Sequence, residues 1–143
     1  MVMNLKLKAS HRLAALLGAA HATAAAATFA LDIGPGGQLL LTFTLLLSFV
    51  LSLRRAALLS TPDAVVEIEW SDEGTLNFKT RDGTWHSARL MPSTFVTPWL
   101  TVINLRTGQR PRVRHVVLMA DSAGAEEYRR LRVRLQWDRA RYA

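Results

Sequence analysis

The sequence predicts a membrane protein of the α+β class, with a two-helix transmembrane hairpin followed by a small antiparallel β-meander domain capped by a C-terminal helix. Two observations predict this class. Between residues 13 and 53 the only charged side chain is Asp32. From residue 65 onward, short segments of alternating apolar and polar residues follow one another, with turn residues between them. A chain of 143 residues has room for such an anchor and one small domain.

Two uncharged segments, 13–31 and 36–53, each have about the length of a transmembrane helix. A hydrocarbon core about 30 Å thick needs about 20 helical residues. Aspartate, glycine and proline gather at 32–37 and indicate a turn between the two segments. The sequence therefore predicts a transmembrane hairpin over 13–55, preceded by a basic N-terminal segment, residues 1–12, in the cytoplasm.

Basic residues flank this hairpin and are absent from its turn. Because basic residues near span ends stay on the cytoplasmic side, we expect both chain termini in the cytoplasm. The residues that predict this topology are Lys6, Lys8, Arg12, Arg54 and Arg55. A basic start followed by an apolar run with small residues is also typical of a cleaved signal peptide. The length of the run and the second span close behind it favour the hairpin.

The first predicted span is rich in alanine. Gly18, Ala22 and Ala26 recur at a spacing of four, which is typical of helix packing within a hairpin or between copies of a chain. A simple alanine bias explains the pattern equally well, so a homo-oligomer through the spans is left open. His21 lies mid-span, and neither span contains a carboxylate partner for it. We therefore expect a neutral hydrogen bond between the helices rather than a proton relay.

Residues 61–143 are predicted to form a cytoplasmic β-rich domain behind a short linker. Asp82-Gly83 is a strong hairpin signal. The segment 99–105 has apolar residues on both faces, which indicates a central strand. Trp70, Trp85 and Trp99 fall at strand positions and are expected in the core. The predicted strands are 65–71, 75–80, 85–90, 93–96, 99–105 and 114–120.

The chain is predicted to end in a helix over about 123–137, with Asp121 or Ser122 as its N-terminal cap. Tyr128, Leu131 and Leu135 would share its buried face. Apolar residues also alternate with arginines from 130 to 137, as in a strand. The acidic start and the good helix formers favour the helix.

The sequence contains few of the residue patterns that catalytic sites require. There is no cysteine, and the four histidines are scattered without the spacing of metal ligands on a helix. No nucleophile motif is present. The sequence therefore predicts a protein that is not an enzyme and has no metal or cofactor.

The C-terminal helix carries the best candidate for a protein-binding surface. Arg130, Val133, Arg134 and Trp137 combine residue types that are enriched at interface hot spots. Arginines near a tethering membrane also suit anionic lipid head groups, which is the alternative. The pI of about 11 suggests nucleic acid, but no recognition motif supports that partner.

Two runs, His-Val-Val-Leu-Met-Ala-Asp-Ser at 115–122 and Glu-Glu-Tyr-Arg-Arg-Leu-Arg at 126–132, resemble the YgfX/CptA family of bacterial inner-membrane proteins. The resemblance implies a multi-pass inner-membrane toxin of a toxin–antitoxin pair, acting on the cytoskeletal proteins FtsZ and MreB. It implies a companion similar to the small factor that promotes flavin attachment to succinate dehydrogenase.

The hypothesis from sequence is thus a non-enzymatic membrane protein whose cytoplasmic domain binds proteins and acts on cell division. The alternative is a lipid-docking or adaptor module linked to flavoprotein maturation.

Overall fold

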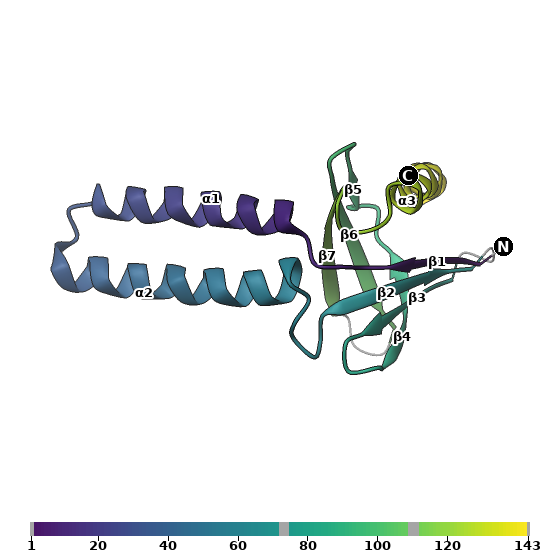
Figure 1. Cartoon of the computed structure of the whole chain (residues 1–143), viewed down its shortest axis with the longest axis horizontal. Coiled ribbons are helices and arrows are strands. Elements are labelled where there is room, and N and C mark those ends of the chain that lie inside the picture. The colour runs from purple at the N-terminus through teal and green to yellow at the C-terminus, as the bar shows by residue number, and fades with distance from the viewer. Residues whose placement is uncertain (1, 72–74, 109–111, 143) are drawn as a thin grey trace.

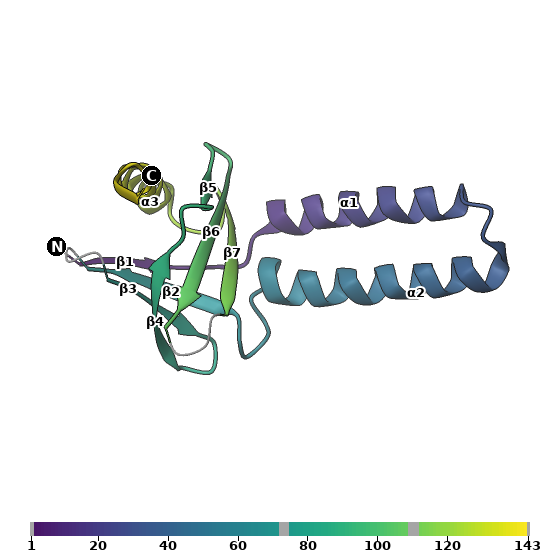
Figure 2. The ribbon, with the colours of Figure 1, turned by 180° about the vertical axis from the view of Figure 1, so that it is seen from behind.

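The computed structural model describes residues 2–71, 75–108 and 112–142. A long helical hairpin projects from a curled antiparallel sheet, and the C-terminal helix lies on the part of the sheet remote from the hairpin (Figures 1 and 2). The predicted α+β class, with an antiparallel sheet and a C-terminal helix, is confirmed.

Two antiparallel helices, α1 (His11–Phe29) and α2 (Gly34–Ser52), form the hairpin. Gly34 begins α2 at φ +75°, a conformation that favours glycine, and Pro35 stands in the first turn, where a missing N–H costs little. The half-buried side chains recur every three or four residues and form one seam on each helix. This seam includes Leu17, His21 and Ala24 in α1 and Thr42, Leu45 and Phe49 in α2.

Beyond Ser52 the chain continues through a π-helical turn, η1 (Leu53–Ala57). Among the described helices, only the continuous segment Gly34–Ala57 is long and apolar enough to cross a membrane. None of the residues of α2 is buried. Of the two predicted transmembrane spans, length and composition therefore support only the second, within the described residues. Helix α1 matches α2 in length, but nine of its 19 residues are alanine, which adds little apolar surface.

The N-terminal segment is a strand rather than a free basic tail. Strand β1 (Met3–Lys6) pairs with β2 (Val65–Trp70), with Met3 opposite Trp70 and Lys6 opposite Glu67. Leu5 is 1% exposed and belongs to the core. Cleavage of a signal peptide would remove this strand, so the fold argues against that alternative. A strand of four residues is too short to be identified in the sequence by the alternation of apolar and polar residues.

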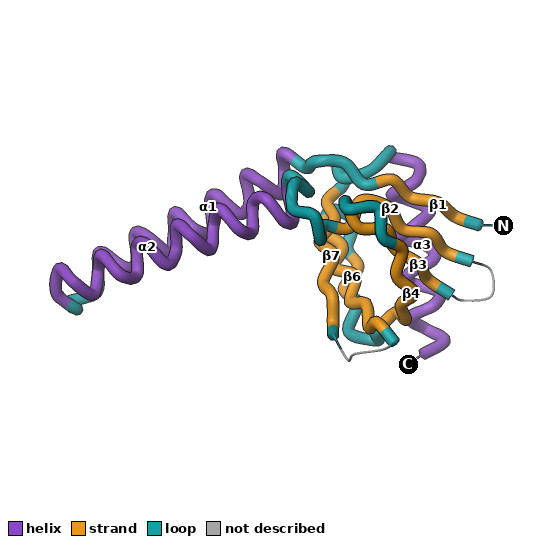
Figure 3. The backbone as a smooth tube through the Cα atoms, turned by 90° about the horizontal axis from the view of Figure 1, so that it is seen from below, coloured by secondary structure: helices purple, strands orange, loops and turns teal. Residues whose placement is uncertain are grey.

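The strands of the sheet are ordered β1-β2-β3-β4-β6-β5, with β7 paired to the other side of β6, and all pairs are antiparallel (Figure 3). The predicted central strand is confirmed, because β6 contacts three others. Gly83 has φ +92° in the β3–β4 hairpin, as its sequence predicts. The further strands are β3 (Leu76–Thr80), β4 (Trp85–Leu90), β5 (Phe95–Val96), β6 (Leu100–Thr107) and β7 (Val113–Met119).

Helix α3 (Ala125–Tyr142) packs on the sheet and completes the core. Tyr128, Leu131 and Leu135 are buried, as the helical spacing predicts, and the Tyr128 hydroxyl lies 3.1 Å from Thr101 Oγ1. The ambiguity at 130–137 is resolved in favour of a helix. The helix extends further than the predicted 123–137 and begins two residues later.

The expectation that three tryptophans lie in the core is wrong for two of them. Of these three, only Trp70 is buried, whereas Trp85 and Trp99 are exposed. In β2 the regular alternation is interrupted, because the register shifts between Val65 and Glu67, and Val65 is buried.

Candidate functional site

The outward face of α3 carries exposed apolar side chains among charged ones. Val133 is 49% exposed and Trp137 is 72% exposed. They line a shallow groove of about 570 Å³. We name this groove the α3 surface; its residues are Glu126, Arg129, Arg130, Val133, Arg134, Trp137 and Asp138. The structure therefore brings together the four residues that the sequence predicted as a partner-binding set.

The two predicted arginines differ in their contacts. Arg130 Nε lies 3.3 Å from Glu126 Oε1, one turn away, and both side chains are largely exposed. Arg134 Nη2 donates to the Ser71 carbonyl oxygen at 2.9 Å, and its guanidinium lies 5.5 Å from the centre of the Trp70 ring. Arg130 thus belongs to the free surface, whereas Arg134 also ties the helix to the sheet.

Asp121 and Ser122 do not cap α3, which corrects the predicted caps. Asp121 Oδ1 accepts a hydrogen bond from Ser10 Oγ at 2.6 Å, and Oδ2 accepts one from the Arg12 backbone N–H at 3.1 Å. Ser10 Oγ in turn accepts from the Leu13 N–H at 3.0 Å and is the N-cap of α1. Ser122 Oγ accepts from the Met119 N–H. Asp121 therefore stabilises the start of the helical hairpin, about 110 residues earlier in the chain.

The negative charge of the Asp121 carboxylate is favourable at the start of α1. Partial burial would raise its pKa, but the hydrogen bonds from Ser10 and from the Arg12 N–H hold the pKa below the ordinary value of 3.8. The carboxylate therefore stays ionised beside the first turn of α1, where the helix dipole favours an anion. The Ser10 N–H also donates to the Ala57 carbonyl oxygen at 2.8 Å, so the start of α1 is joined to the end of η1.

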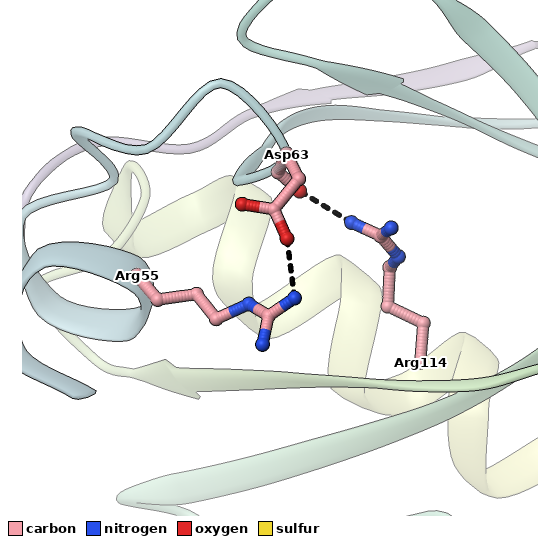
Figure 4. Close-up of polar contacts among 3 residues, drawn as sticks. All are labelled: Arg55, Asp63 and Arg114. Atoms are coloured by element: carbon pink, nitrogen blue, oxygen red, sulfur yellow. Dashed lines mark hydrogen bonds and ion pairs between the residues drawn. The ribbon is translucent and has the colours of Figure 1, made fainter. Parts of the chain in front are cut away.

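A second set of contacts holds the linker that leaves the hairpin (Figure 4). Arg55 of η1 forms an ion pair with Asp63, and Arg114 of β7 donates to the Asp63 carbonyl oxygen. Arg81 Nη1 donates to the Leu59 carbonyl oxygen at 3.0 Å. Burial would raise the pKa of Asp63, but the hydrogen bond and charge of Arg55 are among the contacts that keep it low. The hairpin is thus attached to the sheet by specific contacts at both of its ends.

A cavity of about 1020 Å³ opens beside this attachment. We name it the junction cleft. Its floor includes the buried side chains Phe78, Val116 and Leu118. Its ionisable lining residues are Lys8, Arg55, Asp63, His86, Arg112, Arg114 and His115.

The five residues that predicted the topology lie at the end of the hairpin next to the sheet, or in the sheet itself. Lys6 belongs to β1, and Arg54 and Arg55 belong to η1. Lys8 and Arg12 flank Ser10 at the start of α1, and Lys8 also lines the junction cleft. The basic flanks of the two helices therefore meet at one level (Figure 1).

The predicted small-residue seam of α1 does not mediate the contact with α2. Gly18 is half-buried, but a Cβ atom there would meet nothing within 4 Å. Ala22 and Ala26 are exposed. His21 does reach the other helix: Nδ1 lies 2.8 Å from the Leu17 carbonyl oxygen, and Nε2 lies 3.4 Å from Ser48 Oγ.

Within the described residues there is no group of three or more histidines and carboxylates that could hold a metal ion.

The family model of the membrane-bound toxin component of toxin–antitoxin systems matches residues 1–139. The chain belongs to this family. The resemblance to YgfX/CptA is thereby confirmed, and the protein is a membrane-bound toxin component. Membership implies association with a membrane and a protein partner, the antitoxin. No curated protein and no solved structure matches the chain.

The sequence did not identify most of the residues that join the hairpin of this toxin to its sheet. Ser10 could have been found, because a serine just before an apolar helix is a local capping signal. Asp63 and Arg114 give no such signal, because the contact between them joins segments that are 51 residues apart in the chain.

Proposed function

We propose that this toxin component is a non-enzymatic protein of the bacterial inner membrane, whose sheet domain lies in the cytoplasm and binds a protein partner through the α3 surface. The observation that carries the proposal is the exposure of Trp137 and Val133 in one groove on α3. Helix α3 lies on the part of the domain remote from the membrane hairpin, where a soluble partner has access (Figure 1).

The chemistry of the groove favours a partner with an apolar anchor and an acidic rim. Covering Trp137 and Val133 would remove apolar surface from water, which is favourable by about 25 cal/mol for each Å². Arg129 and Arg130 are exposed beside them. Cations at the rim of an interface speed and orient the approach of an acidic partner.

The proposed topology rests on the positions of the basic residues. The ends of α1 and α2 that carry lysine and arginine lie beside the sheet, and the far loop has none. By the positive-inside rule the sheet domain is cytoplasmic, with both chain termini.

We place α1 beside α2 in the bilayer, because α2 is its antiparallel partner along the hairpin. Its polar side chains are compatible with this position. Thr23 and Thr28 donate to carbonyl oxygens one turn earlier, at 2.9 and 3.0 Å, and such bonds lower the cost of placing hydroxyls in lipid.

The family resemblance supplies candidate partners. We propose an antitoxin companion similar to the flavinylation factor as the ligand of the α3 surface, and FtsZ and MreB as targets of the toxin. The proposal of a non-catalytic mechanism rests on the sequence, which has no cysteine and only scattered histidines.

The test is binding of the full chain, in neutral detergent, to the purified companion and to each cytoskeletal protein. Trp137→Ala should weaken binding of the companion about tenfold or more, as expected for a hot-spot tryptophan. Trp85→Ala is the matched control, because Trp85 is also an exposed tryptophan but lies on β4.

Two results would contradict the proposal. If Trp137→Ala binds the companion as tightly as the unchanged chain, the α3 surface is not the docking site. If neither the companion nor a cytoskeletal protein binds the unchanged chain, the partners inferred from the family are wrong for this toxin.

A further inference from the structure

The junction cleft gathers positive charge at the membrane end of the domain. Its cationic side chains are Lys8, Arg55, Arg112 and Arg114, and its one carboxylate among the lining residues of the described chain is Asp63. They come from the link between β1 and α1, from η1, from the residue before β7 and from β7 itself. The four cations therefore come from three separate stretches of the sequence, at 8, 55 and 112–114.

Two of the four cations are engaged in holding the linker. Arg55 pairs with Asp63, and Arg114 donates to the Asp63 carbonyl oxygen and lies over the Phe78 ring at 5.4 Å. The side chains of Lys8 and Arg112 are exposed, and within the described part of the chain they form no ion pair or hydrogen bond. The cleft therefore contains two cations that have no anionic partner among the described residues.

The position of the cleft identifies the source of a complementary anion. Ala56, at the end of the candidate span Gly34–Ala57, and Leu59, just beyond that end, both line the cleft. Phe78, Val116 and Leu118 add an apolar floor. A ligand that fits has an anionic group beside an apolar part, and it is available where a helix leaves the bilayer.

We propose that the junction cleft binds the phosphate group of an anionic phospholipid from the leaflet at which α2 ends. Lys8 and Arg112 supply the positive charge of the cleft that attracts the phosphate, for which lysine and arginine are the usual donors. The acyl chains leave along the apolar surface of α2. Cations close to a membrane surface are attracted by the anionic lipids of the cytoplasmic leaflet. This lipid site is separate from the arginines of α3, which lie remote from the hairpin (Figures 1 and 2).

The experiment measures ligand binding to the full chain in neutral detergent by native mass spectrometry. The probes are short-chain phosphatidylglycerol, phosphatidylcholine with the same chains, and glycerol phosphate. We expect saturable binding of phosphatidylglycerol, weaker binding of phosphatidylcholine and the weakest binding of glycerol phosphate. The double substitution Lys8→Gln/Arg112→Gln should weaken phosphatidylglycerol binding about tenfold or more, since each cation near a lipid surface contributes to attraction.

The matched control is Arg89→Gln/Arg106→Gln. These two arginines are exposed and face each other across β4 and β6, outside the residues that line the cleft. The control removes the same charge and should leave binding unchanged. A second variant, Lys8→Arg/Arg112→Lys, keeps both charges and should retain most of the binding.

Three results would overturn the proposal. Equal losses in the test and control pairs would mean that net charge, not the cleft, attracts the lipid. Equal binding of phosphatidylglycerol and phosphatidylcholine would exclude recognition of an anionic lipid. Glycerol phosphate binding as tightly as the lipid would assign the cleft to a soluble phosphate.

Discussion

The α3 surface and the junction cleft are both cationic, but they arise in different ways. The α3 surface lies on one helix, and its residues repeat every three or four positions from Glu126 to Trp137. The junction cleft takes Lys8, Arg55, Arg112 and Arg114 from segments up to about 100 residues apart. The first is visible in the sequence, whereas the second exists only in the folded chain.

Their positions relative to the helical hairpin also differ. Helix α3, which has the densest run of arginines, is remote from the hairpin (Figure 1). The more dispersed cations line the junction cleft, together with Ala56 at the end of the hairpin. Some arginines of α3 are also used for packing: Arg132 lies 5.9 Å from the centre of the Tyr128 ring, and Arg134 lies over Trp70. The density of charge along a sequence is therefore a poor guide to the charge that faces a membrane.

The largest effect should distinguish the two faces of α3. Leu131 is 1% exposed, whereas Val133 is 49% exposed. Leu131→Ala should lower the free energy of unfolding by about 2–5 kcal/mol, because it leaves a cavity in the core. Val133→Ala should change it by less than about 0.5 kcal/mol. Chemical unfolding of the full chain in detergent measures both, and similar losses would mean that α3 is not packed as described.

The next effect tests whether the hairpin is rigidly joined to the sheet. Asp121→Ala removes the acceptor for Ser10 Oγ and the Arg12 N–H. This substitution should lower the free energy of unfolding by about 1–2 kcal/mol, the usual loss for a helix cap. Asp121→Asn keeps an acceptor oxygen and should cost less. Asp32→Ala, at the far end of the hairpin, is the control and should be close to neutral. The readout is the unfolding midpoint, and an unchanged midpoint in Asp121→Ala would rule out this capping role.

The same junction should respond to acid. The pKa of Asp121 is lowered in the folded chain, so its carboxylate contributes stability above the ordinary value of 3.8. That contribution is lost as the pH falls through the lowered pKa. The unfolding midpoint of the unchanged chain should therefore fall more steeply below about pH 4 than that of Asp121→Asn. Asp63 is unchanged in both chains and contributes equally to both curves. Parallel curves would show that Asp121 is not responsible.

The smallest effect is expected at the edge of the junction cleft. The side chains of Arg55 and Asp63 are 64% and 45% exposed, so their ion pair is largely solvated. Arg55→Gln should lower the free energy of unfolding by at most about 1 kcal/mol, and this loss should be smaller at high salt. Arg54→Gln, one residue earlier, serves as the control. A loss as large as that of Asp121→Ala would show that the ion pair, rather than the cap, holds the hairpin.

Local patterns predicted much of the fold. The predicted strand over 75–80, the Asp82-Gly83 turn and the buried helix face of Tyr128, Leu131 and Leu135 are all present in the structure. These predictions succeeded because burial on one face imposes the period of the element on its sequence. The exposure of Trp85 and Trp99 was missed, because alternation does not say which face of a strand is covered.

The candidate sites were predicted unequally for the same reason. Val133 and Trp137 share a helix face, which depends only on helical geometry. Asp121 was identified as a cap, but its helix was misassigned, because the sequence order favours the next helix while the fold brings α1 closer. The role of residues 1–12 was missed because a strand of four residues has no period of its own.

The sequence by itself determined the membrane association, the α+β class and the exposed apolar face of α3. Each follows from hydrophobic surface, which is a property of consecutive or periodic residues. Only the tertiary structure decided that residues 3–6 form a strand, that Asp121 accepts hydrogen bonds at the start of the helical hairpin and that Lys8 and Arg112 line one cleft. Those features depend on which distant segments become neighbours, and that is set by packing the whole core.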